Sequence, residues 1–487
     1  MEKIMLGELL QAVGGTLLYP AADSADSRRD REILSVVTDS RRITAGCVFF
    51  ALSGDRFDGH TYVEAALQQG AAGCVISRHP EEFVPDRFYV LVGDTRKALG
   101  DLANFYRKKF DVKVVGITGS VGKTTCREMV ASVLSRHFRV HATRGNFNND
   151  IGLPMTIFDL SARDQVMVLE MGMNHPGEIR RLSQIAEPDI AVITNIGTAH
   201  IGFLGSRENI FLAKKEIFEG MPEGSSAVLW GDDDYLPQIA ESPELTGKYR
   251  ICYAGKSRIC SCLVEDVHME ISGLEEDASR AEMSTACRIR MPGGEILEAR
   301  IPAAGLHLAI PAALAAAVGD LLGMTAEEIR AGIQDFTGQR MPCEKYGDIL
   351  IFDDTYNASP ESMRSSLQVL ACLPVKKKAA VLGDMLEQGE FASALHAEVG
   401  RAAAQAGLDM LITVGELSES MAAAAKAAGL KDVRSFPDRE SAEDAVREIT
   451  SPGTALLFKA SHVTGLDRLA EVSRQQIRNR REVSHGS

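Results

Sequence analysis

Residues 118–125 form a glycine-rich segment whose residue types and spacing fit the binding of a nucleoside triphosphate. An apolar run typical of a buried strand precedes it and a helical pattern follows it, which is the context of a phosphate-binding loop. Its glycines allow backbone N–H groups to converge on an anion, the Lys123 ammonium can neutralise the β- and γ-phosphates, and the Thr124 hydroxyl can ligate Mg²⁺. The residues predicted to bind ATP here are Gly119, Ser120, Val121, Gly122, Lys123, Thr124 and Thr125.

The spacing departs from the strict phosphate-loop pattern, which would place glycine at position 117, where this chain has Ile117. The nearest glycines are Gly116 and Gly119, so the match is to a variant of the motif. The alternative interpretation is a glycine-rich turn with a solvated lysine. The order of strand, loop and helix favours nucleotide binding.

Three further polar residues follow predicted strands that come after this loop. Glu170 ends the apolar run 166–169, His200 lies in the loop after residues 190–195, and Lys214 follows shortly after. Ligands of open α/β sheets bind beyond the carboxyl ends of the strands, where a carboxylate beside a phosphate loop is the expected Mg²⁺ ligand. Each residue alone has an ordinary alternative: a structural carboxylate, a hydrogen-bonded histidine or a surface lysine. Together with the phosphate loop they form a predicted catalytic set, namely Lys123, Glu170, His200 and Lys214.

The elements that must position these residues indicate an α/β protein with three domains. Strands alternate with helices from residue 112 to about 230, which predicts a mainly parallel central sheet. Residues 245–300 fit either an antiparallel annex or a variable excursion. We expect a small N-terminal α/β domain at 1–93, the central phosphate-loop domain at 94–335 and a Rossmann-like C-terminal domain at 336–487.

The C-terminal domain is predicted from apolar runs separated by alanine-rich helical segments. Ser359 and Pro360 are typical of a helix start, with serine as the N-cap and proline at the first helical position. The strands are expected at residues 349–353, 379–382, 410–414 and 455–458.

The composition excludes several classes of protein. The chain has 487 residues and a formal net charge of −14, which argues against a broad nucleic-acid surface. Its nine cysteines are scattered and lie mostly in apolar runs, as expected of reduced thiols in the cytoplasm. No apolar run reaches the roughly 18 residues of a membrane span. The N-terminus carries Glu2 and Glu8 and is predicted to be a short helix, not a signal peptide.

Motifs in all three predicted domains resemble those of the Mur ligases, in the same order along the whole chain. The resemblance is carried by residues 38–41, 51–54, 58–60, 118–125, 145–154, 170–179, 194–200, 353–363 and 381–385, with Glu387 and His396. The run at 353–363, Asp-Asp-Thr-Tyr-Asn-Ala-Ser-Pro-Glu-Ser-Met, is similar to that of the members that add D-alanyl-D-alanine. The Asn-Pro-Arg motif of members that add the third peptide residue is absent from this sequence.

The resemblance implies an ATP- and Mg²⁺-dependent amide ligase with UDP-N-acetylmuramoyl-tripeptide and D-alanyl-D-alanine as its partners. ATP would phosphorylate the tripeptide carboxylate, and the dipeptide amine would attack the acyl phosphate. A monomer suffices for this chemistry, and neither a nucleic acid nor a membrane takes part. Whether the third peptide residue is lysine or diaminopimelate stays open.

The resemblance also implies individual site residues. Lys214 matches the lysine that is carbamylated in many Mur ligases, so its carbamate would join the metal ligands, and burial would favour the loss of the proton that this requires. Arg340 and Asp354 would contact ATP. The implied metal ligands are Thr124, Glu170, His200 and Lys214 as its carbamate. The implied substrate-binding residues are Ser40, Arg41, Ser53, Asp58, Gly59, His60, Asn149 and Asn357.

Two segments depart from the family pattern. Leu308 and Pro311 stand where members often carry asparagines that help to hold the nucleotide base, so base recognition is in doubt. Residues 459–462 read Lys-Ala-Ser-His instead of Lys-Gly-Ser-Arg.

Two rival functions stay open: a sister ligase that uses another amino acid, and a phosphate-loop switch or binding module without ligase chemistry. Residues 38–41, 51–54 and 58–60 resemble the family's UDP-sugar-binding region, which argues against the second rival.

Overall fold

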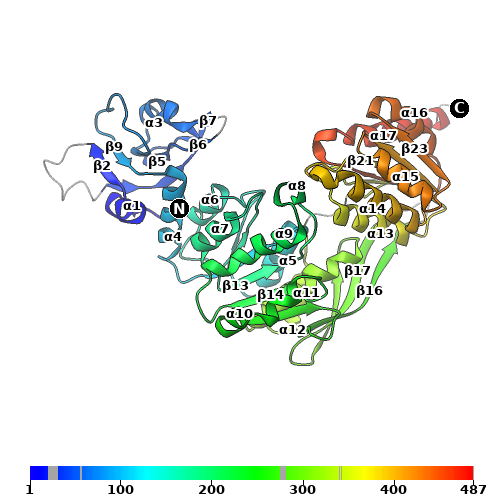
Figure 1. Cartoon of the computed structure of the whole chain (residues 1–487), viewed down its shortest axis with the longest axis horizontal. Coiled ribbons are helices and arrows are strands. Elements are labelled where there is room, and N and C mark those ends of the chain that lie inside the picture. Colours follow the sequence, from blue (N-terminus) through cyan, green and yellow to red (C-terminus); the bar gives the residue numbers. More distant parts are fainter. Residues whose placement is uncertain (20–30, 55–56, 275–280, 339–340, 342, 486–487) are drawn as a thin grey trace. The chain divides into compact units, whose positions relative to one another are not determined.

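A computed structural model of the chain describes residues 1–19, 31–54, 57–274, 281–338, 341 and 343–485 (Figure 1). Its residues group into two compact units. The first contains Met1–Thr118, Phe138–Ala191 and Lys215–Ser226, and the second contains Gly119–His137, Val192–Lys214 and Ala227–Ser487. Both combine helices with β-sheet, so the α/β class predicted from the sequence is confirmed.

The N-terminal part of the first unit contains a five-stranded sheet in the order β2-β9-β8-β5-β4. The four parallel strands are β4 (Ser35–Val37), β5 (Cys47–Phe50), β8 (Gly73–Ile76) and β9 (Phe88–Leu91), and β2 (Thr16–Tyr19) joins antiparallel at the edge. Strand β5 is buried along its length, which accounts for its continuous apolar sequence. Helix α3 (Val63–Gln68) contributes Val63, Ala66 and Leu67 to the same core as Phe49 and Cys74.

A nine-stranded sheet has the order β11-β12-β10-β13-β14-β15-β16-β17-β18. Strands β11 (Val140–Ala142), β12 (Val166–Glu170) and β10 (Lys113–Thr118) are parallel, as the alternation of strands and helices predicts. Helix α5 (Lys123–Leu134) follows β10, α6 (Gly152–Phe158) precedes β12, and α7 (Glu178–Ala186) leads to β13 (Ile190–Ile193). Strand β14 (Ser226–Trp230) continues the sheet.

The far end of this sheet decides between the two alternatives for residues 245–300. Strand β15 (Arg250–Gly255) pairs parallel with β16 (Cys262–Ser272), and β17 (Glu282–Arg290) and β18 (Ile296–Ile301) then extend the sheet antiparallel. The segment is therefore an antiparallel annex. Helices α11 (Ala309–Leu321) and α12 (Ala326–Gln334) follow it, and α11 contacts both α5 and β16.

The C-terminal sheet has six strands in the order β19-β20-β24-β21-β22-β23. Its strands are β19 (Cys343–Tyr346), β20 (Ile349–Asp353), β21 (Lys377–Gly383), β22 (Met410–Val414), β23 (Asp432–Phe436) and β24 (Thr454–Lys459). All pair in parallel except the edge strand β19. The four predicted strands are confirmed, and so is the start of α13 (Pro360–Cys372), where Ser359 caps the helix.

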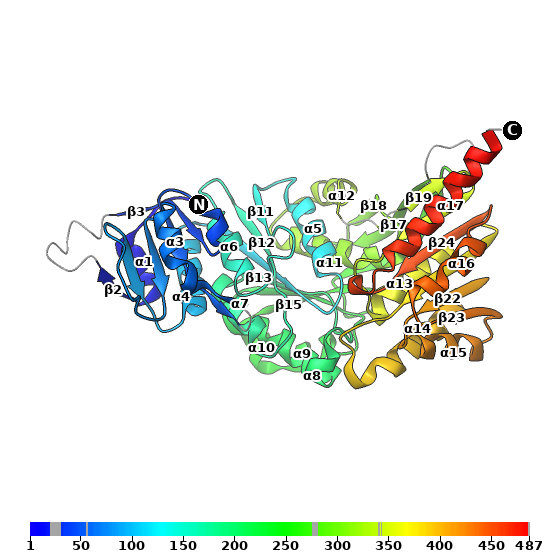
Figure 2. The ribbon, with the colours of Figure 1, turned by 90° about the horizontal axis from the view of Figure 1, so that it is seen from above.

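The order of the C-terminal strands fixes where its helices lie. The chain passes from β20 through β21 and β22 to β23 in one direction and returns to β24 in the other. Right-handed crossovers therefore place α13, α14 (Ala392–Gln405) and α15 (Glu419–Ala427) on one face and α16 (Arg439–Ile449) on the other. Helix α17 (Asp467–His485) packs against α16 and lies along β20 and β24 (Figure 2).

Among the residues described, no helix combines the length and apolar character that crossing a membrane requires. The nine cysteines all lie among the described residues, and none of them forms a disulfide.

Candidate functional site

The phosphate loop lies between β10 and α5, and its glycines are required by geometry. Gly119 has φ +151°, and a Cβ added there would lie 1.9 Å from Thr194 Oγ1. Gly122, at φ +78°, is the N-cap of α5 in the left-handed conformation. Any other residue would be strained at these two positions. The loop thus delivers its backbone N–H groups to the N-terminus of a 12-residue helix, where an anion is stabilised.

Lys123 is the first residue of α5, and its ammonium turns back over the loop. Its Nζ donates to the carbonyl oxygens of Gly119, at 2.7 Å, and Ser120, at 3.1 Å. These bonds place the positive charge at the mouth of the loop, where a bound phosphate would need it.

The loop after β13 holds the phosphate loop from the side. The side-chain amide of Asn195 pairs with both backbone groups of Val121. Its Oδ1 accepts from Val121 N at 3.1 Å, and its Nδ2 donates to Val121 O at 2.9 Å. Ser120 N donates to Asn195 O at 3.0 Å, and Gly197 N donates to Ser120 Oγ at 2.9 Å. The predicted site residues do not include Asn195, although its place directly after a strand was a usable signal.

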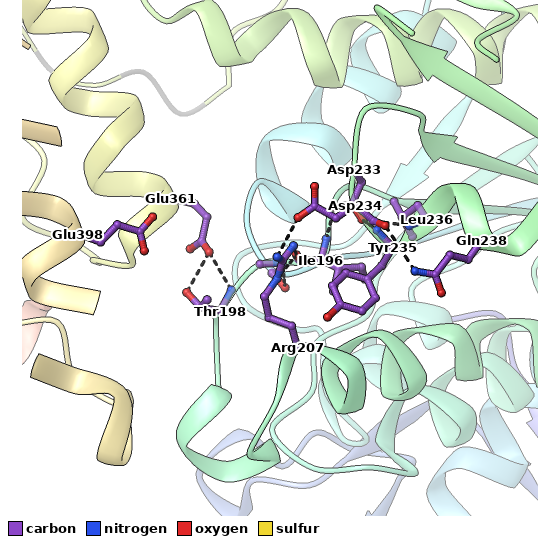
Figure 3. A network of polar contacts seen from close by, with 12 residues as sticks. Ile196, Thr198, Arg207, Asp233, Asp234, Tyr235, Leu236, Gln238, Glu361 and Glu398 are labelled. Carbon is purple, nitrogen blue, oxygen red and sulfur yellow. Dashed lines mark hydrogen bonds and ion pairs between the residues drawn. The ribbon is translucent and has the colours of Figure 1, made fainter. Parts of the chain in front are cut away.

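Side chains from three directions fix the loop from Ile196 to Thr198 (Figure 3). Asp233 Oδ2 accepts from Ile196 N at 2.8 Å, and Arg207 donates to Ile196 O at 2.7 Å. Glu361, in α13, accepts from both Thr198 N and Thr198 Oγ1. No local pattern predicts these two contacts, because Asp233 lies 37 residues from Ile196 and Arg207 lies 11 residues from it, beyond the reach of a turn or a helix cap.

Lys214 lies near the end of α9 (Arg207–Lys215) and is 1% exposed. Burial lowers the pKa of its amine well below the usual range, and the positive charge of Lys123 lowers it further. Lys215, the next residue, is half-buried. A Lys-Lys-Glu run usually indicates a helix face exposed to solvent, but the side chain of Lys214 is buried in the protein.

His200 is the N-cap of the short helix α8 (Ile201–Leu204) and has the left-handed conformation, at φ +63°. Its Nδ1 lies 3.3 Å from Glu387 Oε2, so the ring faces a carboxylate of the C-terminal part of the same unit. A positive φ is uncommon outside glycine and marks a backbone held by its surroundings.

Glu170 lies at the end of β12 in the first unit and is 2% exposed. Its carboxylate accepts from Asn148 Nδ2 at 2.9 Å, and its backbone pairs in register with Ile117, two residues before Gly119. Asn149, a predicted substrate-binding residue, lies just before α6, and its Oδ1 accepts from Gly152 N at 2.8 Å.

Within the described ranges, no group of three or more His, Cys, Asp or Glu side chains forms a metal site. Mg²⁺ does not require one, because it usually keeps several waters and binds through one or two carboxylates plus substrate phosphates. The carboxylate of Glu170 and the hydroxyl of Thr124 are the hard oxygen donors that it prefers. Glu170, of the first unit, and Thr124, of the second, therefore each suit Mg²⁺ by the chemistry of their donor atoms.

Three of the predicted UDP-sugar residues gather around Asp58 in the N-terminal part of the first unit. Its Oδ1 accepts from Ser53 Oγ at 3.0 Å, from His60 N at 3.0 Å and from His60 Nδ1 at 2.9 Å. These hydrogen bonds hold the pKa of the Asp58 carboxyl well below its usual range, and the bond from the backbone N–H of His60 has the largest effect. Position 59 requires glycine, because a Cβ there would lie only 2.6 Å from the carbonyl oxygen of Leu52.

The other two predicted UDP-sugar residues lie at the turn after β4. Ser40 and Arg41 form the 3₁₀ turn Ser40–Arg42, and Arg41 pairs with Asp39 at 2.8 Å, an interaction that lowers the pKa of Asp39 to about 2. Both charged side chains of this pair are substantially exposed.

Asp354 and Asn357 lie just beyond β20, at the carboxyl ends where the C-terminal strand order reverses. This is the usual ligand position of such a sheet. Lys459, at the end of β24 and 2% exposed, donates to Asp354 Oδ2 at 2.6 Å and to Asn357 O at 2.9 Å. Ser366 Oγ also donates to Asp354 Oδ2, at 2.6 Å. The predicted residue Arg340 lies outside the described residues.

The segment that departs from the family pattern is largely apolar. Leu308 and Pro311 are buried at the start of α11. The neighbouring His307 has its pKa lowered by burial to about 4, so its ring is neutral near pH 7.

Comparison with known proteins places this geometry in a family. The Mur ligase middle domain matches residues 117–319, the glutamate ligase domain of Mur ligases matches 339–462, and the catalytic domain of the Mur ligase family matches 32–107. The chain belongs to the Mur ligase family.

Similar proteins include one enzyme and two solved structures. The UDP-N-acetylmuramoyl-tripeptide–D-alanyl-D-alanine ligase of Bacillus subtilis (strain 168) is 34% identical over 97% of this chain and 98% of its own length. A crystal structure of MurF from Acinetobacter baumannii matches with a TM-score of 0.85 and 31% identity, over 97% of this chain and 99% of that one. MurF ligase from Thermotoga maritima in complex with ADP matches with a TM-score of 0.79 and 29% identity, over 92% and 98%.

Proposed function

We propose that the protein joins D-alanyl-D-alanine to UDP-N-acetylmuramoyl-tripeptide in an ATP-dependent reaction and so forms a peptidoglycan precursor. The observation that carries this proposal is the full-length similarity to ligases named for that reaction, over a chain that keeps an intact phosphate loop. We also propose that it acts as a monomer in the cytoplasm. Residues 1–93 would bind the UDP-sugar, 94–335 would bind ATP, and 336–487 would bind the dipeptide.

The phosphate loop would serve the first chemical step. A carboxylate oxygen of the tripeptide attacks the γ-phosphorus of ATP, and the bond between that phosphorus and the bridging oxygen of the β-phosphate breaks. ADP departs, and the tripeptide becomes an acyl phosphate. Because an anion attacks an anion, the ammonium of Lys123 and the N–H groups at the start of α5 must offset the charge that builds up. Lys123 is already held over the loop by Gly119 and Ser120.

Mg²⁺ would supply further charge neutralisation when it is bound with the triphosphate. Thr124, Glu170, His200 and Lys214 are the residues that we propose to hold it directly or through water. Lys214 would do so as its carbamate. Its buried amine, with a lowered pKa, is readily neutral, and a neutral amine can bond to CO₂ and release a proton.

In the second step the amine nitrogen of the dipeptide attacks the acyl carbon. A tetrahedral intermediate forms, the bond to the phosphate oxygen breaks, and the nitrogen loses its proton. Asn357 lies at the carboxyl edge of the C-terminal sheet and would orient the dipeptide. Asp354, held by Lys459 and Ser366, would contact the ATP ribose.

A direct assay tests the proposed function. The purified protein is incubated with ATP, Mg²⁺, UDP-N-acetylmuramoyl-tripeptide and one amine at a time, and phosphate release and product mass are measured. We expect phosphate release only with D-alanyl-D-alanine. Phosphate release with a single amino acid instead would establish the sister ligase, and ATP hydrolysis independent of any amine would establish the switch.

Matched lysine variants connect that activity to the phosphate loop. Lys123→Ala should reduce the rate at least about a hundredfold, as expected for the loss of one electrostatic stabiliser. Lys113→Ala, which removes an exposed lysine from the start of the preceding strand, serves as the control. Equal rates in the two variants would remove Lys123 from the mechanism.

A further inference from the structure

Three consecutive backbone amides after β13 each donate to a side chain from a different element. Ile196 N donates to Asp233, which follows β14; Gly197 N donates to Ser120 of the phosphate loop; and Thr198 N donates to Glu361 of α13. The segment 196–198 is therefore a junction in the second unit. It joins the loop that receives phosphate to the helix that follows the predicted dipeptide-binding residues.

The contact with Glu361 is close and specific. One oxygen, Oε1, accepts from Thr198 N at 2.8 Å and from Thr198 Oγ1 at 2.9 Å (Figure 3). A Cβ added at Gly197 would lie 2.6 Å from the same oxygen, so glycine is needed for the carboxylate to approach. The second oxygen, Oε2, is buried and accepts no hydrogen bond from the residues described.

Glu361 is rigidly connected to the segment that contains Asn357. It is the second residue of α13, whose start is fixed by the reciprocal capping of Ser359 and Ser362. Asn357 lies four residues earlier, and its carbonyl is held by Lys459. A displacement of Glu361 would therefore move the start of the helix together with the segment that we assign to the dipeptide.

We infer that Glu361 is a positioning residue that sets the dipeptide-binding segment relative to the phosphate loop. The inference rests on the proposed ligase function. Glu361 touches neither substrate; it acts through Thr198 on one side and through the first turn of α13 on the other. Its oxygen Oε1 accepts from Thr198 N and Thr198 Oγ1 at once, so the contact constrains both the position and the direction of the side chain at the start of α13.

The step that depends on Glu361 is the attack of the amine on the acyl phosphate. Without Glu361, the junction keeps its bonds to Asp233 and Ser120, so the phosphate loop keeps its shape. The helix start loses its hydrogen bonds to the junction. Misplacement of a reacting group by about 1 Å can cost a factor of about a hundred in rate. The loss should therefore fall on the second step and spare the first.

Hydroxylamine separates the two steps. It attacks the acyl carbon directly, forms a C–N bond, expels phosphate and leaves a hydroxamate, so it needs the acyl phosphate but no dipeptide-binding segment. In Glu361→Ala we expect hydroxamate formation within about threefold of the parent. Ligation of D-alanyl-D-alanine should fall at least about tenfold, with a raised KM for the dipeptide and an unchanged KM for ATP.

Three further variants guard against a purely structural effect. Glu361→Gln keeps the oxygen that accepts both Thr198 donors and changes only the oxygen without a hydrogen bond, so ligation should recover to within about threefold of the parent. Glu398→Gln removes the negative charge that pairs with Arg364, one turn further along α13, without touching Thr198, and should behave as the parent. Thr198→Val should weaken ligation in the parent and add nothing in Glu361→Ala.

Each outcome is decisive. If the parent does not ligate D-alanyl-D-alanine, the proposed function fails and the inference fails with it. If the parent ligates but Glu361→Ala matches Glu398→Gln, only the inference is wrong. Equal losses of hydroxamate and ligation also overturn it, and so do additive effects of Thr198→Val and Glu361→Ala.

Discussion

Asn195 offers a test of how the phosphate loop is held, because one atom of its side chain can be changed without changing its shape. In Asn195→Asp, Oδ1 still accepts from Val121 N, as it does at 3.1 Å in the parent. The other side-chain position becomes an oxygen that faces Val121 O, to which the parent Nδ2 donates at 2.9 Å. The substitution therefore turns one hydrogen bond into a repulsion.

The expected effect follows from that distance. The lost hydrogen bond contributes about 1 kcal/mol. Two oxygens with about half a unit charge each, 2.9 Å apart at an effective dielectric constant of about 20, repel by roughly 1.4 kcal/mol. Val121 O keeps its bond from Thr194 Oγ1 at 2.7 Å, so it is not left without a donor. A total of about 2 kcal/mol corresponds to a rise of about thirtyfold in the KM for ATP.

The assay is steady-state phosphate release over a range of ATP concentrations, with the peptide substrates saturating. Asn104→Asp is the matched control, since Asn104 lies on α4 (Thr95–Arg107) of the first unit and its Nδ2 also donates to backbone carbonyls, at 3.1 and 3.0 Å. Its KM for ATP should stay within about threefold of the parent. If the two variants raise the KM equally, the Asn195 clamp does not shape the nucleotide site.

The proposed metal ligands, the dipeptide segment and a buried histidine give further expected outcomes. Lys214→Ala should be nearly inactive, and high acetate should restore part of the rate by supplying a carboxylate; a rate unaffected by acetate counts against the carbamate. Glu170→Ala should raise the Mg²⁺ concentration needed for half-maximal rate, and overlapping titrations would place the metal elsewhere. Asn357→Ala should raise the KM for D-alanyl-D-alanine more than that for ATP; the reverse would assign the segment to the nucleotide. Neutral His396 accepts from Met385 N at 2.9 Å, and burial lowers its pKa, so below about pH 6.5 the unfolded chain binds a proton that the folded one does not. Urea midpoints should therefore fall with acidification more steeply in the parent than in His396→Gln, and equal slopes would contradict this.

Local patterns in the sequence were sufficient where a short segment determines its own conformation. The strand, glycine-rich turn and helix around Lys123 follow from apolar runs and from glycines whose backbone angles other residues avoid. The start of α13 follows from Ser359 and Pro360, because an N-cap and a proline at the first helical position act within one turn.

Other features depended on which distant segments meet. Residues 245–300 permitted two interpretations, because strand pairing is decided by partners and not by the strand alone; β16 to β18 resolved it. The burial of Lys214 had the same origin. A Lys-Lys-Glu run at a helix usually faces water, and only packing places one of the two lysines in the interior.

The sequence by itself thus determined the α/β class, the phosphate loop and the strand ends that carry the candidate chemistry. The tertiary structure decided which residues hold those groups in place. Asp233 lies 37 residues from the amide it accepts from, and Glu361 lies 163 residues from Thr198. Periodicity and turn preferences act over a few residues, whereas such contacts form only when the chain has folded, so their residue types carry no local signal.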